Sequence, residues 1–76
     1  MEEFNIFFSI NEMYVPILEI VIRSFIEHNS FSDNRFCIYV LYLSMNESSI
    51  EALENLSANN IKISCKKIDI SNLSFF

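Results

Sequence analysis

The residues best suited to binding chemistry lie close together near the start of the chain: Ser9, Asn11, Glu12 and Tyr14. They follow an apolar segment, residues 5–10, and precede Pro16. The amide of Asn11 can donate and accept hydrogen bonds, so it suits the edge of a nucleobase. The flat ring of Tyr14 is of the kind on which a base stacks. These residue types therefore indicate recognition of a base.

The same residues also have a purely structural explanation. Asn11 is a good cap for a following helix, and Tyr14 can pack on the edge of a sheet. Glu12 has the chemistry of a general acid or base, but a carboxylate in an exposed loop is usually solvated. Residue chemistry alone leaves both interpretations open.

Composition and charge exclude several classes of function. The chain has no glycine among its 76 residues, and ten acidic against five basic residues give a net charge of −5. Without glycine it has neither a P-loop nor the GxGxxG dinucleotide motif. Without a basic stripe it does not fit nucleic acid, and an anionic membrane surface is disfavoured for the same reason. The nearest approach to a basic stripe is a group of three lysines, Lys62, Lys66 and Lys67. We interpret them as a solvated face or as edge protection.

No apolar run reaches the roughly 20 residues that a membrane-spanning helix needs. Glu19 and Arg23 interrupt residues 15–26, and residues 37–43 are only seven long. Residues 1–3 (MEE) are acidic, whereas a signal peptide begins with basic residues, so we expect a cytoplasmic protein.

The two cysteines and the single histidine do not form a metal or catalytic motif. Cys37 and Cys65 are 28 residues apart with no CxxC pair, which is not a zinc-site spacing, so we expect buried free thiols. His28 lies near the expected end of a helix, where a cation complements the helix dipole, and we assign it no catalytic role.

The hydrophobic pattern predicts strand, helix, strand for the first part of the chain. Residues 5–10 have the pattern of a short buried strand. From about Tyr14 to residues 28–30, apolar residues recur at helical spacing, and Pro16 fits the first turn. Residues 35–43 are apolar on both faces, as in the central strand of a parallel sheet.

A second helix and a third strand are expected after residue 43. Ser44 with Glu47 has the pattern of a capping box, and Asn46 is itself a good cap. The helix is expected to end at residues 59–60, because asparagine can replace glycine at a helix end. Residues 61–65 alternate as a strand with one buried face. The pattern then changes phase toward Ile68 and Ile70, which predicts a bend or bulge near residues 66–67.

This order predicts an α/β fold: a βαβαβ Rossmann-like half with mainly parallel strands and right-handed crossovers. If the strands are added in one direction, both helices cover the same face of the sheet. The other face of residues 35–43 then stays bare, and a large bare apolar face marks a contact surface. We therefore expect self-association or a missing C-terminal half. The ending, residues 73–76 (LSFF), favours an incomplete fold that is part of a longer protein.

Residues 5–16 (NIFFSINEMYVP), with the helix that follows through residue 29, resemble the N-terminus of glycosyltransferase family 8. The later FCIYVL strand and NESSIEALENL helix are also similar, so the resemblance covers essentially the whole chain. It implies that residues 1–76 are the N-terminal nucleotide-binding part of a GT-A domain. The activity implied is retaining transfer of a hexose from a UDP-sugar to a saccharide or glycan acceptor, with Mn²⁺ as the cofactor.

The resemblance also implies roles for three residues. Tyr14 would stack on the uracil, and Asn11 would form a hydrogen bond with the edge of the base. The backbone of Ser9 would run past the nucleotide. Met13 departs from the family, which often has asparagine at that position.

The metal-binding D-x-D of the family is absent, because Asp33 and Asp69 are the only aspartates. A hard cation such as Mn²⁺ needs clustered oxygen ligands. We therefore predict no metal ligand and no catalytic residue in these 76 residues, and at best weak binding of a UDP-sugar. The alternative is a non-catalytic α/β module that covers its bare sheet face by self-association or with a partner protein.

Overall fold

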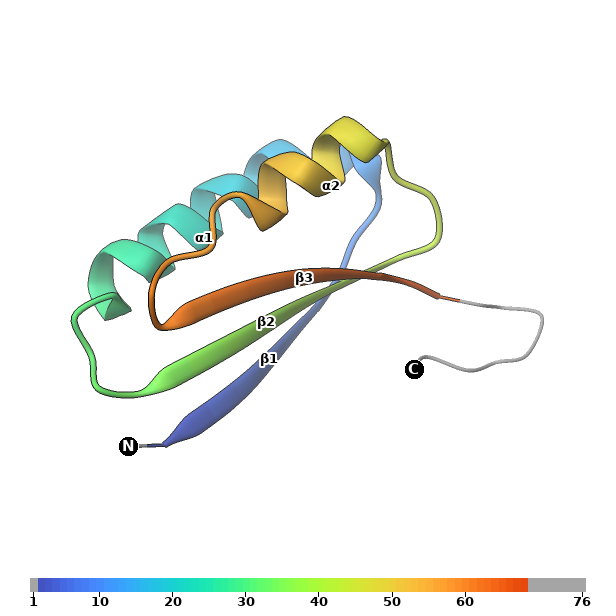
Figure 1. Ribbon diagram of the computed structural model, residues 1–76. Helices are drawn as coiled ribbons and strands as arrows, with labels where there is room; N and C mark the ends of the chain where they lie inside the picture. Colours follow the sequence, from blue (N-terminus) through green and yellow to red (C-terminus); the bar gives the residue numbers. More distant parts are fainter. Residues whose placement is uncertain (1, 69–76) are drawn as a thin grey trace.

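The apolar segments of the chain form one three-stranded sheet, and the two amphipathic segments form the helices that cover it (Figure 1). The computed structural model describes residues 2–68. Its elements are β1 (Glu3–Ser9), the 3-10 turn η1 (Glu12–Tyr14), α1 (Val15–Asn29), β2 (Arg35–Tyr42), α2 (Glu47–Glu54) and β3 (Ile61–Lys67). The strands are all parallel, in the order β1-β2-β3. The predicted α/β class and the central position of the second strand are confirmed.

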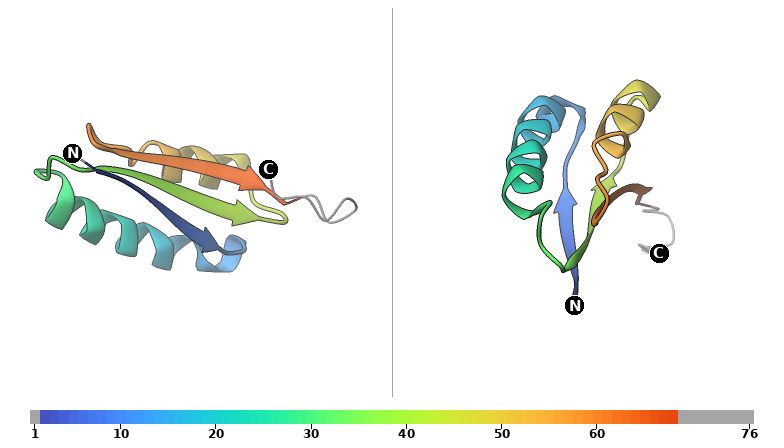
Figure 2. Two further views of the ribbon diagram at one scale, coloured as in Figure 1. Left: turned by 90° about the horizontal axis from the view of Figure 1, so that it is seen from below. Right: turned by 60° about the vertical axis from the view of Figure 1, so that its left-hand side comes forward.

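Both helices lie on the same face of the sheet, as Figures 1 and 2 show. This is the arrangement expected when the strands are added in one direction by crossovers of one hand. In the part of the chain that the structure describes, no helix covers the other face. The predicted one-sided layer is therefore confirmed. Neither helix within residues 2–68 combines the length and the hydropathy that crossing a bilayer requires.

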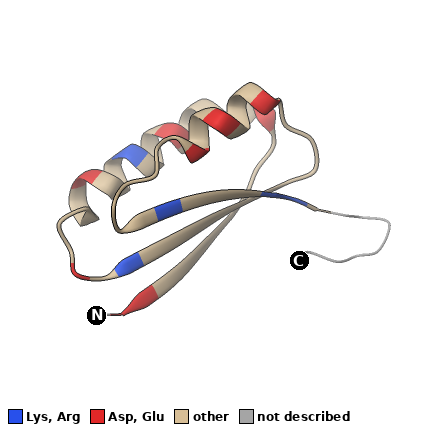
Figure 3. Ribbon diagram, in the orientation of Figure 1, with Lys and Arg blue, Asp and Glu red and all other residues tan. Residues whose placement is uncertain are grey.

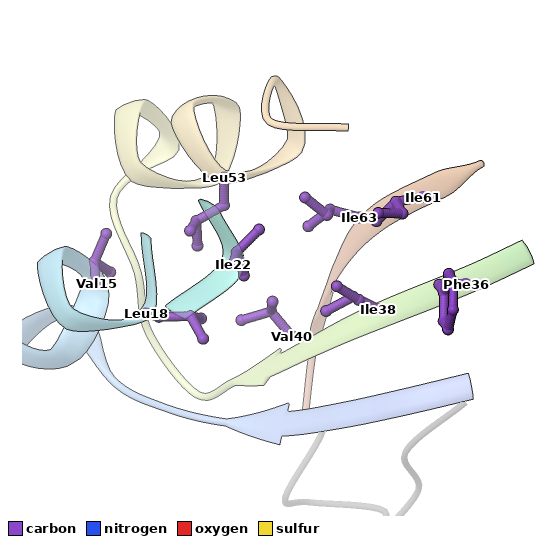
Figure 4. Packing of buried hydrophobic residues seen from close by; sticks show 9 residues of the cluster. All are labelled: Val15, Leu18, Ile22, Phe36, Ile38, Val40, Leu53, Ile61 and Ile63. Atoms are coloured by element: carbon purple, nitrogen blue, oxygen red, sulfur yellow. The ribbon is translucent and has the colours of Figure 1, made fainter. Parts of the chain in front are cut away.

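The core lies between this helical layer and the sheet (Figure 4). It consists of nine buried apolar residues: Val15, Leu18, Ile22, Phe36, Ile38, Val40, Leu53, Ile61 and Ile63. Alternate residues of β2 face the helices, so Ile38 and Val40 are buried while Tyr39 between them is only half-buried. In Figure 4, Leu53 points down from α2 toward Ile22 of α1. Leu53 is the only buried residue of α2.

An asparagine side chain ties the connections together at the amino end of the sheet. The Nδ2 of Asn60 donates to the backbone carbonyls of Asn29 at 2.9 Å, Asn34 at 3.0 Å and Ser32 at 3.3 Å. One amide therefore links the start of β3 to the loop between α1 and β2.

The second helix is shorter than predicted. It ends at Glu54 and not at residues 59–60. The Ser57 hydroxyl donates to the Glu54 carbonyl at 2.8 Å, and Ala58 exchanges backbone hydrogen bonds with Ile61. These contacts turn the chain back along the edge of β3, so the helix cannot continue.

No bulge forms near residues 66–67, where a bend or bulge was predicted. Pairing between β2 and β3 continues without interruption to Tyr42 and Lys67, and the Ile68 amide donates to the Tyr42 carbonyl at 2.7 Å. Lys67 is in phase with the buried Ile61 and Ile63 but is itself exposed, so the strand carries a polar residue there without a bulge. Ile70, and residues 73–76, from which a longer protein was expected, lie outside the described residues.

Replacing Leu53 by alanine tests the anchoring of α2. We expect Leu53→Ala to lower the free energy of unfolding by about 2–5 kcal/mol, because it leaves a cavity at a fully buried site. That loss is a large share of the stability of so small a chain. Urea unfolding followed by circular dichroism measures it. The exposed Glu51→Ala on the same helix is the control, and an equal loss in both variants would contradict the anchoring role.

Candidate functional site

The loops after β1 and β2 meet at the carboxyl end of the sheet. Ligands of open α/β sheets bind in the crevice beyond this end. Ser9 is the last residue of β1, and the amide of Ile10 donates to the Leu41 carbonyl at 3.0 Å. That bond extends the pairing with β2 by one residue before the first loop begins.

Asn11 closes the turn that follows. Its Oδ1 accepts from the Met13 amide at 3.1 Å, and its backbone carbonyl accepts from the Tyr14 amide at 3.1 Å. The structural interpretation of Asn11 as a cap is therefore confirmed, although it caps η1 and not α1 directly. The Nδ2 of Asn11 has no hydrogen-bond partner within residues 2–68, so it can still donate to a ligand.

Tyr14 lines a shallow hollow of about 340 Å³ between the end of β1 and α1. The volume is at the lower end of the range for small-molecule sites. The other lining residues are Phe8, Ser9, Ile10, Ile17, Leu18 and Val21. Half of the Tyr14 surface is exposed. Of the three predicted site residues, the structure brings Ser9 and Tyr14 together at this hollow, while Asn11 does not line it.

Glu12 has a defined structural role that the sequence did not indicate. Its Oε1 accepts from the Asn46 amide at 2.8 Å, and its Oε2 accepts from the Ser49 hydroxyl at 2.6 Å. The carboxylate therefore lies at the N-terminus of α2, where the helix dipole favours a negative charge.

The predicted capping box of Ser44 and Glu47 is wrong. Asn46 is the N-cap residue of α2, and its side chain makes no capping hydrogen bond. Glu12 instead accepts from the Asn46 amide, the group that the side chain of the third helical residue bonds in a capping box. One sequence signal could have indicated this contact of Glu12. The loops that follow two adjacent parallel strands meet at one edge of the sheet.

The comparisons with protein-family models, curated proteins and solved structures give no match for this chain. The likeness to glycosyltransferase family 8 therefore stays a prediction from the sequence.

The described residues do not fit a Mn²⁺ site. Within residues 2–68, no three His, Cys, Asp or Glu side chains gather into a group that could hold a metal. Asp33 lies in the loop before β2, at the opposite end of the sheet from the hollow, and Asp69 is outside the described residues. We therefore derive no chemical step through a metal for this chain.

The cysteines are free, as predicted, but both are only half-buried. Cys37 lies on the helix-free face because its neighbours in β2 point into the core, and Cys65 packs against the core cluster. Burial, followed by the charge of Glu54, raises the pKa of Cys65 to about 11. A raised pKa favours the protonated thiol of Cys65 at neutral pH.

Glu12 makes the stability of the fold depend on pH. The hydrogen bond from Ser49, and then that from Asn46, lowers the pKa of Glu12 below its usual 4.5. A lowered pKa stabilises the folded chain at any pH above the usual pKa, and this contribution is lost as the pH falls through the lowered pKa.

We expect Glu12→Gln to flatten the pH dependence of stability below pH 4.5, measured by urea unfolding at several pH values. Glu51→Gln is the control, and equal acid sensitivity of Glu12→Gln and the wild type would contradict the role of Glu12.

Proposed function

We propose that this chain is the N-terminal nucleotide-binding part of a retaining glycosyltransferase that uses a UDP-sugar. One observation carries the proposal: Ser9 and the half-exposed Tyr14 meet at a hollow at the carboxyl end of β1. Ligands bind at this position in open α/β sheets. The resemblance of residues 5–29 to glycosyltransferase family 8 supplies the substrate class, a hexose donor carried on UDP.

The contacts of the loop favour recognition of the base over recognition of the phosphates. Tyr14 presents a ring on which uracil can stack. Asn11 has its Oδ1 engaged by the Met13 amide, so its Nδ2 donates to a carbonyl of the base. Helix N-termini commonly bind phosphate, but Glu12 already lies at the N-terminus of α2. A diphosphate at that position would meet a carboxylate.

We expect the described residues alone to bind a UDP-sugar only weakly. Neutralising the diphosphate would require cations or a metal that the described residues do not gather at the hollow. We therefore assign the metal, the acceptor site and the catalytic step to further polypeptide, and the uridine contact to Ser9, Asn11 and Tyr14.

Titration with UDP and UDP-sugars, with and without Mn²⁺, tests the proposal. We expect weak binding of UDP that Mn²⁺ does not tighten. Tyr14→Ala should weaken it about tenfold, because stacking on one aromatic ring contributes roughly 1–3 kcal/mol. Phe31→Ala is the matched control, since Phe31 is an exposed aromatic residue at the other end of the sheet.

Two results would count against this proposal. Equal affinity of Tyr14→Ala and the wild type for UDP would exclude stacking on Tyr14. Tight binding of a UDP-sugar that appears only with Mn²⁺ would show that the chain holds a metal site after all.

The helix-free face of the sheet supports a second candidate, a non-catalytic module that binds another protein or itself. On this face Tyr39 stacks on Phe7 with ring centroids 4.9 Å apart, and Leu41 follows along β2. On the neighbouring strand β3, Lys62 and Lys66 lie opposite Cys37 and Leu41 and therefore share this face. Figure 3 shows lysines along β3 and most acidic residues on the helices. This candidate predicts a contact surface with an apolar centre and a basic border.

Leu41→Lys tests this second candidate, because it adds a charge to the helix-free face of the central strand, two residues beyond Tyr39. If the face is the contact surface, self-association measured by sedimentation should weaken about tenfold or more. A wild-type chain that sediments as a stable monomer would exclude self-association through this face.

A further inference from the structure

The two edges of the sheet differ in whether their outward backbone groups are paired. At the edge of β3 the chain's own connection covers four of these groups. Ile61 exchanges backbone hydrogen bonds with Ala58, at 2.8 and 3.2 Å. The Ile63 amide donates to the Ser57 hydroxyl at 3.0 Å, and the Cys65 amide donates to Glu54 Oε2 at 2.9 Å. No strand can add to this edge without breaking these contacts.

The edge of β1 has no such cover at two of its outward-facing residues. The Arg35 amide donates to the Glu2 carbonyl, and the Ile10 amide donates to the Leu41 carbonyl. In a parallel pair, every second residue directs both its backbone N–H and its backbone C=O toward the same neighbouring strand. The even-numbered residues of β1 therefore bond β2, and Asn5 and Ser9 direct their backbone groups outward. Nothing within residues 2–68 pairs with those outward groups of Asn5 and Ser9.

An apolar groove runs beside this open edge. Ile17 and Val21 of α1 line the hollow next to Phe8, although 58% and 45% of their surfaces are exposed. A smaller hollow of about 40 Å³ continues along the strand between Ile6 and Phe25. No charged residue lines either hollow. The flank of α1 that faces the edge of β1 is therefore apolar where a helix facing water would be polar.

We propose that the β1 edge and this α1 flank form the interface of a two-fold dimer of this chain. The second copy adds its own β1 antiparallel to the first and extends the sheet to six strands. A two-fold axis perpendicular to the sheet keeps all the helices on one side. The apolar flanks of the two α1 helices then face each other and cover Ile17 and Val21.

The edges and the charges favour a second copy as the occupant. Because the β3 edge is blocked, copies cannot add β1 to β3 into an open filament. Only the symmetric β1-to-β1 contact remains, and it closes on itself. Two copies that each carry a net charge of −5 repel least where the surface is uncharged. Antiparallel pairing also places the two Glu3 side chains at opposite ends of the interface.

Sedimentation equilibrium of the 76-residue chain without nucleotide tests the proposal. We expect a monomer–dimer equilibrium that Ile17→Lys weakens about tenfold or more, because a charge enters the apolar contact. Ile20→Lys is the matched control: Ile20 is 69% exposed on the same helix but lines neither hollow. Asn5→Pro should also weaken the dimer, because it removes an outward amide that β2 does not use.

Hydrogen exchange on the wild-type chain gives a test that needs no variant. Protection of the Asn5 amide should rise with protein concentration, whereas protection of the Ile6 amide, which points toward β2, should not change. A monomer at every concentration would overturn the proposal. A dimer that Leu41→Lys breaks, and that Ile17→Lys and Asn5→Pro leave intact, would overturn it too, because the interface would then be the helix-free face.

Discussion

The packing of the helix-facing side of β2 is the contact on which the other elements depend. Ile38 and Val40 are at most 1% exposed, and both helices and both outer strands contribute to the cluster around them. A chain of this size has a thin core, so few other contacts can compensate for a loss there. Backbone pairing holds β1 and β2 in register, and this packing holds the helices over them, so the two loops meet at the carboxyl end of the sheet.

Glu12 connects the packed core to the loops at the carboxyl end of the sheet. By bonding Asn46 and Ser49 it joins the loop after β1 to the start of α2. It also places a fixed negative charge where a phosphate would otherwise be favoured. The first loop also exposes the uncharged side chains of Met13 and Tyr14. If the first loop holds a nucleotide as proposed, this arrangement suits the neutral base and leaves the charged phosphates to other groups.

The parts of the fold that follow from periodicity could be predicted from the sequence. The two-sided apolar pattern of residues 35–43 placed β2 in the centre, and the order of elements placed both helices on one face. The parts that depend on side chains distant in sequence could not. Glu12 bonds residues 34 and 37 positions away, and Asn60 bonds carbonyls 26 to 31 positions away. Propensity and spacing carry no information about such partners, so the capping box was predicted wrongly. The end of α2 was missed for a local reason, because Ser57 and Ala58 turn the chain directly after Glu54.

The two proposed uses of the β1 side compete for the same residues. The hollow that Ser9 and Tyr14 line is also lined by Ile17 and Val21, which the second copy would cover. A ligand that binds only the monomer must shift the equilibrium away from the dimer, by an amount set by its affinity and concentration. If further strands of a longer polypeptide paired with β1, they would exclude the second copy in the same way. The open edge of β1 is therefore the point at which binding, association and completion of the sheet are coupled. The covered edge of β3 leaves β1 as the edge of this sheet, within residues 2–68, at which a further strand can pair.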